Sequence, residues 1–166
     1  MTDLAYVAVR YLHIAFAVLW MGAIVLMNVV FFPRVERLDP AGRKAFFATF
    51  GKPIARYGEL SGFLAIGFGL LLYARLFELG TLVAGTAHAN LYLAAFLLAV
   101  VVLLLGALVL FPRMKRVMLL MDAAPPGPPP PEVLRLMKPM PLIGMLGMVL
   151  VFVILGLMVA GMTGAY

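Results

Sequence analysis

The sequence contains no cysteine, which excludes disulfides, thiolate metal sites and thiol redox chemistry from its 166 residues. Charge is also scarce: Asp, Glu, Lys and Arg make up 12% of the chain, whereas hydrophobic residues make up 65%. Soluble domains carry about 25% charged residues, so this balance excludes an ordinary water-exposed surface. The sequence also lacks a glycine-rich phosphate loop, a His-Glu zinc helix and paired carboxylates in one hydrophobic stretch. These absences argue against a hydrolase or an ATPase.

What the chain does contain is four long hydrophobic stretches, at residues 4–31, 54–77, 87–111 and 139–163. Crossing a hydrocarbon core of ~30 Å takes about 20 apolar residues, so each stretch can span a membrane as a helix. We therefore predict an all-α integral membrane protein, a four-helix bundle that forms a single transmembrane domain over residues 1–166. Since Asp3 stands where a basic leader would be, we expect the first stretch to be retained and not cleaved as a signal peptide.

Lysine and arginine are distributed unevenly along the chain. Eleven of the thirteen lie in the connections that follow the first and third stretches, and only Arg10 and Arg75 lie toward the other face. The positive-inside rule then predicts that both connections are cytoplasmic and both termini are outside, on the periplasmic side of a bacterial inner membrane. The net charge of +6 is explained by this topology and by contact with the lipid bilayer, so it requires no nucleic acid partner.

A short internal repeat relates the two halves of the chain. The tripeptide Phe-Pro-Arg ends the first and third stretches, at 32–34 and 111–113, and Lys-Pro precedes the second and fourth, at 52–53 and 138–139. We therefore predict two parallel helical-hairpin repeats, related by a pseudo-twofold axis along the membrane normal. The alternative is that these prolines mark helix ends for ordinary reasons.

The two long connections differ in character. Residues 123–132 read Ala-Ala-Pro-Pro-Gly-Pro-Pro-Pro-Pro-Glu, which favours extended polyproline II and predicts a stiff cytoplasmic linker. A docking motif for a proline-binding partner is the alternative for this run. Residues 41–50 instead mix basic residues with phenylalanine in a pattern that is compatible with a helix, so we expect this segment to lie on the inner headgroup layer.

The chain has only two histidines, His13 and His88, and both are expected near the outer face, on the first and third stretches. A neutral imidazole is a good ligand for haem iron or copper, so we predict that the pair holds a haem b. Arg10 and Arg75 would meet the haem propionates. Tyr11, Tyr92 and Trp20 complete the predicted surroundings of the cofactor. The alternatives are a single catalytic or ligating histidine, and purely structural or interfacial histidines, with His88 in a loop.

Methionine allows a second metal hypothesis. Met158 and Met162 on the fourth stretch are expected toward the same face as the histidines, and thioether with imidazole suits Cu(I). Methionine is equally an ordinary packing residue, so these two can also belong to the core of the bundle.

Asn28 and Glu59 are polar residues inside the hydrophobic stretches, where polar groups are costly. We predict that they hydrogen-bond between the first two helices, with Ser61 or Arg56 nearby; a proton-accepting Glu59 is the alternative. Seven glycines of the second and fourth stretches would allow close helix packing, within one chain or in a homodimer. They are Gly58, Gly62, Gly67, Gly69, Gly144, Gly147 and Gly156.

The first hydrophobic stretch also resembles a known family. Its residues Leu12-His13, Trp20, Gly22 and the tripeptide at 32–34 are similar to the opening helix shared by copper resistance D membrane proteins and the bacterial membrane-bound protoporphyrinogen IX oxidases. The resemblance covers residues 11–38. It implies that His13 is the first-helix histidine, which in the oxidase group is associated with haem b, and that Trp20 is the motif tryptophan.

Three functions are compatible with the sequence. The first is a haem b protein in electron transfer or porphyrin oxidation, which would make the chain an oxidoreductase or an electron carrier. The second is a copper-handling membrane protein. The third is a cofactor-free accessory subunit of a larger respiratory or photosynthetic complex. The substrate and the redox partner stay open.

Overall fold

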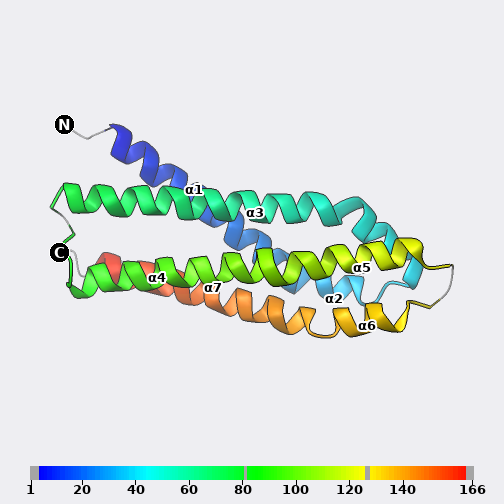
Figure 1. The fold of residues 1–166 in the computed structure, drawn as a ribbon. Coiled ribbons are helices and arrows are strands. Elements are labelled where there is room, and N and C mark those ends of the chain that lie inside the picture. The colour runs from blue at the N-terminus through cyan, green and yellow to red at the C-terminus, as the bar shows by residue number, and fades with distance from the viewer. Residues whose placement is uncertain (1–3, 81, 126–127, 164–166) are drawn as a thin grey trace.

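The computed structural model describes residues 4–80, 82–125 and 128–163. Four long helical runs lie side by side in it (Figure 1), and the described residues contain no strand. By length and composition, all four runs, Leu4–Val35, Pro40–Glu78, Ala87–Ala123 and Pro131–Met162, can cross a membrane. The prediction of an all-α fold is confirmed, and the four long apolar runs are compatible with a membrane helical bundle.

The runs are divided into nine elements in the described part of the chain. These are α1 (Leu4–Leu26), η1 (Met27–Phe31), α2 (Phe32–Val35), α3 (Pro40–Glu78), α4 (Ala87–Leu104), η2 (Leu105–Leu110), α5 (Phe111–Ala123), α6 (Pro131–Met137) and α7 (Met140–Thr163). The start of α1 and the end of α7 lie at one end of the bundle, which we call the terminal end (Figure 1). The opposite end, where α2, α5 and α6 lie, carries most of the lysine and arginine, and we call it the basic end.

The first Phe-Pro-Arg tripeptide lies in the last turn of its helical run, which ends at Val35, whereas after the second the helix runs on to Ala123. Each tripeptide is preceded by a π-helical turn, η1 before Pro33 and η2 before Pro112. The turns are marked by hydrogen bonds that reach back five residues, from the Phe32 N–H to the Met27 carbonyl and from the Phe111 N–H to the Gly106 carbonyl. Proline has no N–H and clashes with the carbonyl four residues earlier. The wider turn relieves that clash, which explains why both helices pass through their prolines.

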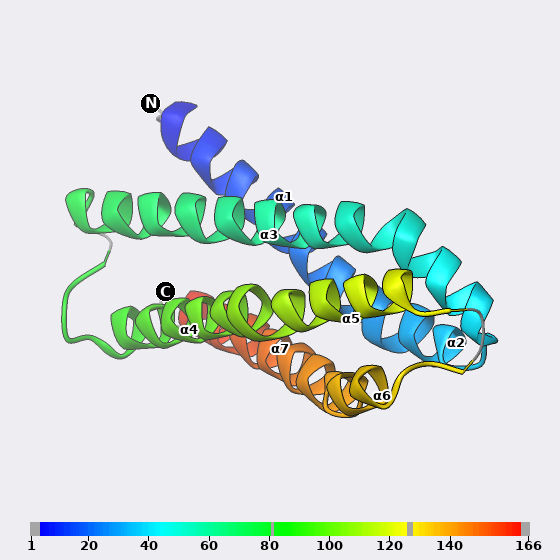
Figure 2. The ribbon, with the colours of Figure 1, turned by 45° about the vertical axis from the view of Figure 1, so that its right-hand side comes forward.

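The helix α3 is also longer than its hydrophobic stretch. It is capped by Asp39, whose side chain accepts a hydrogen bond from the Gly42 N–H at 2.9 Å, and it runs for 39 residues from Pro40 through Pro53 to Glu78. Residues 41–50 are therefore the first part of this helix and not a separate one. Figures 1 and 2 show that α3 bends in its first third, and we attribute the bend to Pro53.

The proline-rich connection leaves the helical conformation at both of its ends. Ala124 after α5 has φ −77° and ψ 142°, and Pro130 before α6 has φ −53° and ψ 147°. Both are close to polyproline II values. Pro131 and Glu132 already belong to α6, and residues 126–127 lie outside the described residues.

The helices pack in pairs around two separate hydrophobic clusters. The most extensive packing is between α1 and α3, and between α4 and α7 (Figure 2). The transmembrane cluster joins these four helices through Trp20, Ala65, Ala95, Ala99, Val102, Val151 and Ile154. The basic-end cluster joins α2, the first part of α3, α5, α6 and the start of α7 through Val35, Phe47, Met114, Val117, Met121, Val133 and Met140. Many other large apolar side chains are exposed on the outside of the bundle, as expected for contact with lipid.

Candidate functional site

His13 lies in α1 and faces α3. Its Nδ1 atom is 2.9 Å from the Ala65 carbonyl oxygen, and the ring makes no other hydrogen bond among the described residues. A carbonyl oxygen can only accept, so Nδ1 carries the proton in this contact. The neutral ring therefore keeps its lone pair on Nε2, which is the nitrogen left to bind a metal.

Gly69 gives His13 the space for this position. A Cβ atom at residue 69 would lie 2.8 Å from the histidine Cε1 and 3.0 Å from Nδ1. Trp20 uses Gly62 in the same way, because a Cβ there would lie 2.9 Å from the indole. His13 and Trp20 are seven residues apart on α1, and their glycines are seven residues apart on α3 in the reverse order. The two helices therefore run antiparallel and approach closely along one line of contact.

Asn28 faces α7 and not α3. It lies in η1, which packs against α7, and its Oδ1 would overlap a Cβ atom at Gly144. Its Nδ2 donates to the Ile24 carbonyl at 2.8 Å. The predicted hydrogen bond between Asn28 and Glu59 is absent among the described residues, since the π-helical turn places the amide against α7.

Ser61, the third polar group expected near Asn28, is also satisfied within its own helix. Its hydroxyl donates to the Tyr57 carbonyl at 2.6 Å and lies 3.3 Å from that of Gly58. Glu59 makes no hydrogen bond or ion pair in the described part of the chain. The structure therefore does not bring the polar residues of the first two helices together.

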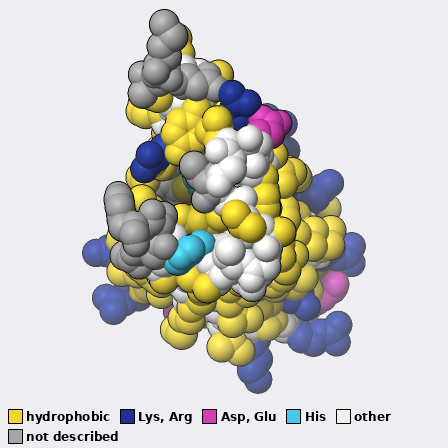
Figure 3. All heavy atoms as spheres, turned by 90° about the vertical axis from the view of Figure 1, so that its left-hand side faces the viewer, with side chains coloured by type: hydrophobic (Ala, Val, Ile, Leu, Met, Phe, Trp, Pro, Cys, Tyr) yellow, Lys and Arg dark blue, Asp and Glu magenta, His cyan; other side chains and the backbone are white. Residues whose placement is uncertain are grey.

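His88 is the second residue of α4 and so lies in the helix rather than in the loop. The helix starts after Thr86, whose side chain accepts a hydrogen bond from the Ala89 N–H at 3.3 Å. The Nδ1 atom of His88 is buried and has no hydrogen-bond partner among the residues described. Figure 3 looks onto this terminal end, where hydrophobic side chains dominate and a histidine reaches the surface.

The two histidines lie at different depths in the bundle. His13 contacts Gly69, which is nine residues, or ~13 Å of helix, from Glu78 at the end of α3. His88 lies in the first turn of α4, which begins at that same end (Figure 1). Bonds between a metal and an imidazole are about 2 Å long, so two axial ligands of one iron stand ~4 Å apart. The structure does not bring the two rings to one level.

Tyr92 occupies in α4 the place that His13 occupies in α1. His13 lies 20 residues before Pro33, and Tyr92 lies 20 residues before Pro112. Tyr92 also packs on a glycine, because a Cβ at Gly161 would lie 2.9 Å from its ring. His88, which we predicted as the partner of His13, lies 24 residues before Pro112. Counting back equally from the two prolines gives Tyr92 as the counterpart of His13 instead.

Arg10 lies within electrostatic range of Tyr92, together with Tyr6. The other predicted site residues are more dispersed. Arg75 forms an ion pair with Glu78 at 2.6 Å, and Tyr11 is 69% exposed.

The two methionines of the copper hypothesis face different surroundings. Met158 packs against the transmembrane cluster, whereas Met162 is 49% exposed. The described residues also contain no group of three or more His, Cys, Asp or Glu side chains that could hold a metal ion.

A pocket of about 100 Å³ lies on the basic side of Trp20, between the two π-helical turns and α7. Its lining is apolar apart from Asn28 and the Trp20 indole, and it includes Phe32 and Phe111 of the two repeated tripeptides. Neither histidine lines this pocket.

Comparison with protein-family models, with curated proteins and with solved structures found no match to this chain.

Proposed function

We propose that this chain is a haem b-binding integral membrane protein that works in electron transfer or in the haem-linked oxidation of a porphyrin, and that His13 would be a ligand of the haem iron. The hydrogen bond from His13 Nδ1 to the Ala65 carbonyl, at 2.9 Å, carries the proposal. Ligating histidines commonly donate their second nitrogen to a carbonyl or carboxylate, which orients the ring and raises its basicity. A bound haem would supply one-electron chemistry at its iron.

His88 is the proposed second ligand. Its Nδ1 is buried without a partner among the described residues, and a buried polar atom of this kind is costly unless a ligand or water meets it. Since His88 lies nearer the terminal end than His13, ligation of one iron by both requires α4 or α1 to shift along its axis. Arg10, close to Tyr92, is the proposed partner of a propionate.

The proposed topology has both termini on the periplasmic side of a bacterial inner membrane. Its support is the distribution of charge, since eleven of thirteen basic residues lie in α2, the first half of α3, α5, α6 or the residues next to these elements. The two histidines then lie toward the periplasmic face.

The bundle is proposed to consist of two parallel hairpins, α1–α3 and α4–α7. Two observations support this repeat: each hairpin packs mainly within itself, and each has a π-helical turn directly before its Phe-Pro-Arg tripeptide. If the two tripeptides resembled each other only by chance, there would be no reason for a π-helical turn to precede both of them.

The test is an absorption spectrum, oxidised and dithionite-reduced, of detergent-purified protein produced with ample haem. We expect a Soret band and a sharp reduced α-band in the wild type. Loss of these bands in both His13→Ala and His88→Ala would establish paired ligation, and loss only in His13→Ala would establish a single ligand. Val159→Ala is the control, because Val159 is exposed on α7 and should leave the spectrum unchanged. A featureless spectrum from folded wild-type protein would overturn the proposal.

A cofactor-free accessory subunit is the second candidate. His13, Trp20, Asn28 and Tyr92 all pack over glycines, and such contacts alone would justify their presence in a bundle. This function predicts that partner proteins co-purify and that His13→Ala behaves as wild type. Copper analysis of the same preparation tests the remaining alternative, with Met158 and Met162 as proposed ligands beside the histidines.

A further inference from the structure

A second pocket, of about 250 Å³, lies at the basic end between the first part of α3 and α5. Its lining residues recur at helical spacing on both helices, so one face of each helix forms the pocket. They are Lys44, Phe47, Ala48 and Lys52 from α3, and Lys115, Met118, Leu119, Met121 and Asp122 from α5. Two segments about 70 residues apart in the sequence therefore build one site.

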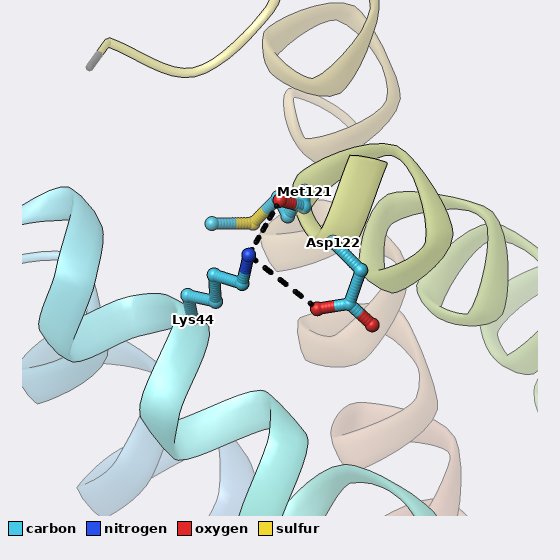
Figure 4. Close-up of polar contacts among 3 residues, drawn as sticks. All are labelled: Lys44, Met121 and Asp122. Carbon is cyan, nitrogen blue, oxygen red and sulfur yellow. Dashed lines mark hydrogen bonds and ion pairs between the residues drawn. The ribbon is translucent and has the colours of Figure 1, made fainter. Parts of the chain in front are cut away.

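The pocket carries an excess of positive charge. Its lining contains three lysines and one aspartate, which leaves a formal charge of +2. Lys44 is engaged within the protein, because its Nζ donates to the Met121 carbonyl at 3.0 Å and lies 3.7 Å from Asp122 Oδ1 (Figure 4). Lys52 and Lys115 are exposed and have no ion pair among the described residues. Two cations are thus left for an anion from outside.

The remaining wall of the pocket is apolar. Phe47 is buried, and Met118 packs over Gly51, where a Cβ would lie 2.9 Å from the Met118 Sδ. Leu119 is 56% exposed and continues the apolar wall onto the outside of the bundle. A ligand with an anionic head and a hydrocarbon tail matches this combination of lysines and exposed apolar surface.

The helices extend beyond the hydrocarbon core at this position. At 1.5 Å per residue, the 39 residues of α3 measure ~58 Å, against ~30 Å for the hydrocarbon and about 40–45 Å with the headgroups. Lys44 and Lys52 lie in the first third of α3, next to the hydrophobic stretch. The pocket is therefore at the level expected for lipid headgroups.

We propose that this pocket binds the phosphate of an anionic phospholipid, with Lys52 and Lys115 pairing with the phosphate and an acyl chain lying along Leu119. The bound lipid bridges α3 and α5 and sets the depth of the basic end in the bilayer. This site is independent of any haem at the terminal end.

The test is native mass spectrometry of the full-length protein in detergent, titrated with phosphatidylglycerol or with phosphatidylcholine of the same acyl chains. Each lysine near an anionic lipid contributes about fivefold in affinity, so with two lysines the wild type should prefer phosphatidylglycerol by roughly 25-fold. The double variant Lys52→Gln/Lys115→Gln should bind the two lipids about equally. The matched control is Arg135→Gln/Lys138→Gln, which removes the same charge from exposed residues outside the pocket and should keep the preference.

Equal loss of preference in both double variants would overturn the proposal, because the effect would then belong to the charge of the whole basic end. A wild type without preference would overturn it as well. A competition experiment with glycerol phosphate distinguishes a lipid from a free phosphate as the ligand. If this soluble anion displaces the lipid at a matched concentration, the pocket is a free-phosphate site and the assignment to a lipid is contradicted.

Discussion

The transmembrane cluster and the basic-end cluster differ in how their helices come together. Around the first, large or polar side chains of α1 meet glycines of α3, as in the contacts of His13 with Gly69 and Trp20 with Gly62. The second is filled by valine, methionine and phenylalanine side chains, with Val133 fully buried. Lipid tails are as apolar as leucine, so within a bilayer helices gain by close contact rather than by burying apolar surface. At the basic end, where water is near, burial of apolar side chains is itself stabilising.

The largest effect should come from filling a glycine contact of the first cluster. In Gly62→Leu, a Cβ 2.9 Å from the Trp20 ring and 3.0 Å from Leu103 leaves no room for the remaining leucine atoms. We expect loss of the folded bundle, or destabilisation beyond the ~1–3 kcal/mol typical of overpacking, measured by thermal unfolding in detergent. Gly67→Leu is the control on the same helix, because a Cβ there meets nothing within 4 Å. Equal tolerance of both variants would show that close contact does not hold α1 to α3.

At the basic end, shortening a buried side chain should be more damaging than enlarging a small one. Val133 is 0% exposed, so Val133→Ala should lower the free energy of unfolding by about 2 kcal/mol. The neighbouring Leu134 is 52% exposed, and Leu134→Ala should change the stability little. Denaturant unfolding measures both variants. A larger loss in Leu134→Ala would mean that α6 presents its other face to the bundle.

The variant Gly69→Ala, with a smaller expected effect on stability, tests whether His13 only packs between helices or also binds haem. The added methyl group of Gly69→Ala would lie 2.8 Å from His13 Cε1 and must turn the ring. We expect destabilisation of ~1 kcal/mol, because alanine regains helix propensity while the contact is lost. If His13 binds haem, the Soret band should also shift or weaken, and Gly67→Ala should leave it in place. An unchanged band in a haem-loaded Gly69→Ala variant would exclude His13 as the ligand.

The smallest effects should come from the two prolines of the repeated tripeptides. Pro33→Ala and Pro112→Ala each restore an N–H and remove the clash that the π-helical turn relieves. The proposed repeat makes the two turns equivalent, so we expect stability changes below about 1 kcal/mol with the same sign in both variants. Thermal unfolding of the two variants side by side tests this equivalence. Opposite signs would contradict the repeat.

The prediction of a helical protein with four stretches long enough to span a membrane was possible because it depends on local composition alone. Each hydrophobic stretch is long enough to span a membrane whatever its neighbours are. Helix boundaries were less predictable where proline was involved. Pro33, Pro53 and Pro112 all lie within longer helical runs, since π-helical turns and a bend accommodate them. Proline patterns indicate a local disturbance of the helix, but not whether the helix stops.

The candidate site was only partly accessible to sequence reasoning. His13 was identified by its rarity in a hydrophobic stretch, but its carbonyl partner Ala65 and its glycine Gly69 carry no signal of their own. The sequence analysis used Lys52 and Lys115 only as part of the overall charge distribution. It did not predict that these two lysines line one pocket. Lys52 and Lys115 are 63 residues apart, and only the packing of α3 against α5 brings them to one pocket.

Hydropathy and charge act along each helix, so they are enough to predict a bundle of four apolar helices with its positive charge at one end. Which side chains meet follows from the packing of the helices: His13 contacts Ala65, Asn28 contacts Gly144, and Lys44 contacts the end of α5. Those contacts depend on how each helix is rotated and where it crosses its neighbours. An almost uniformly apolar helix has no polar face to indicate that rotation, so only the packing of the whole bundle sets it.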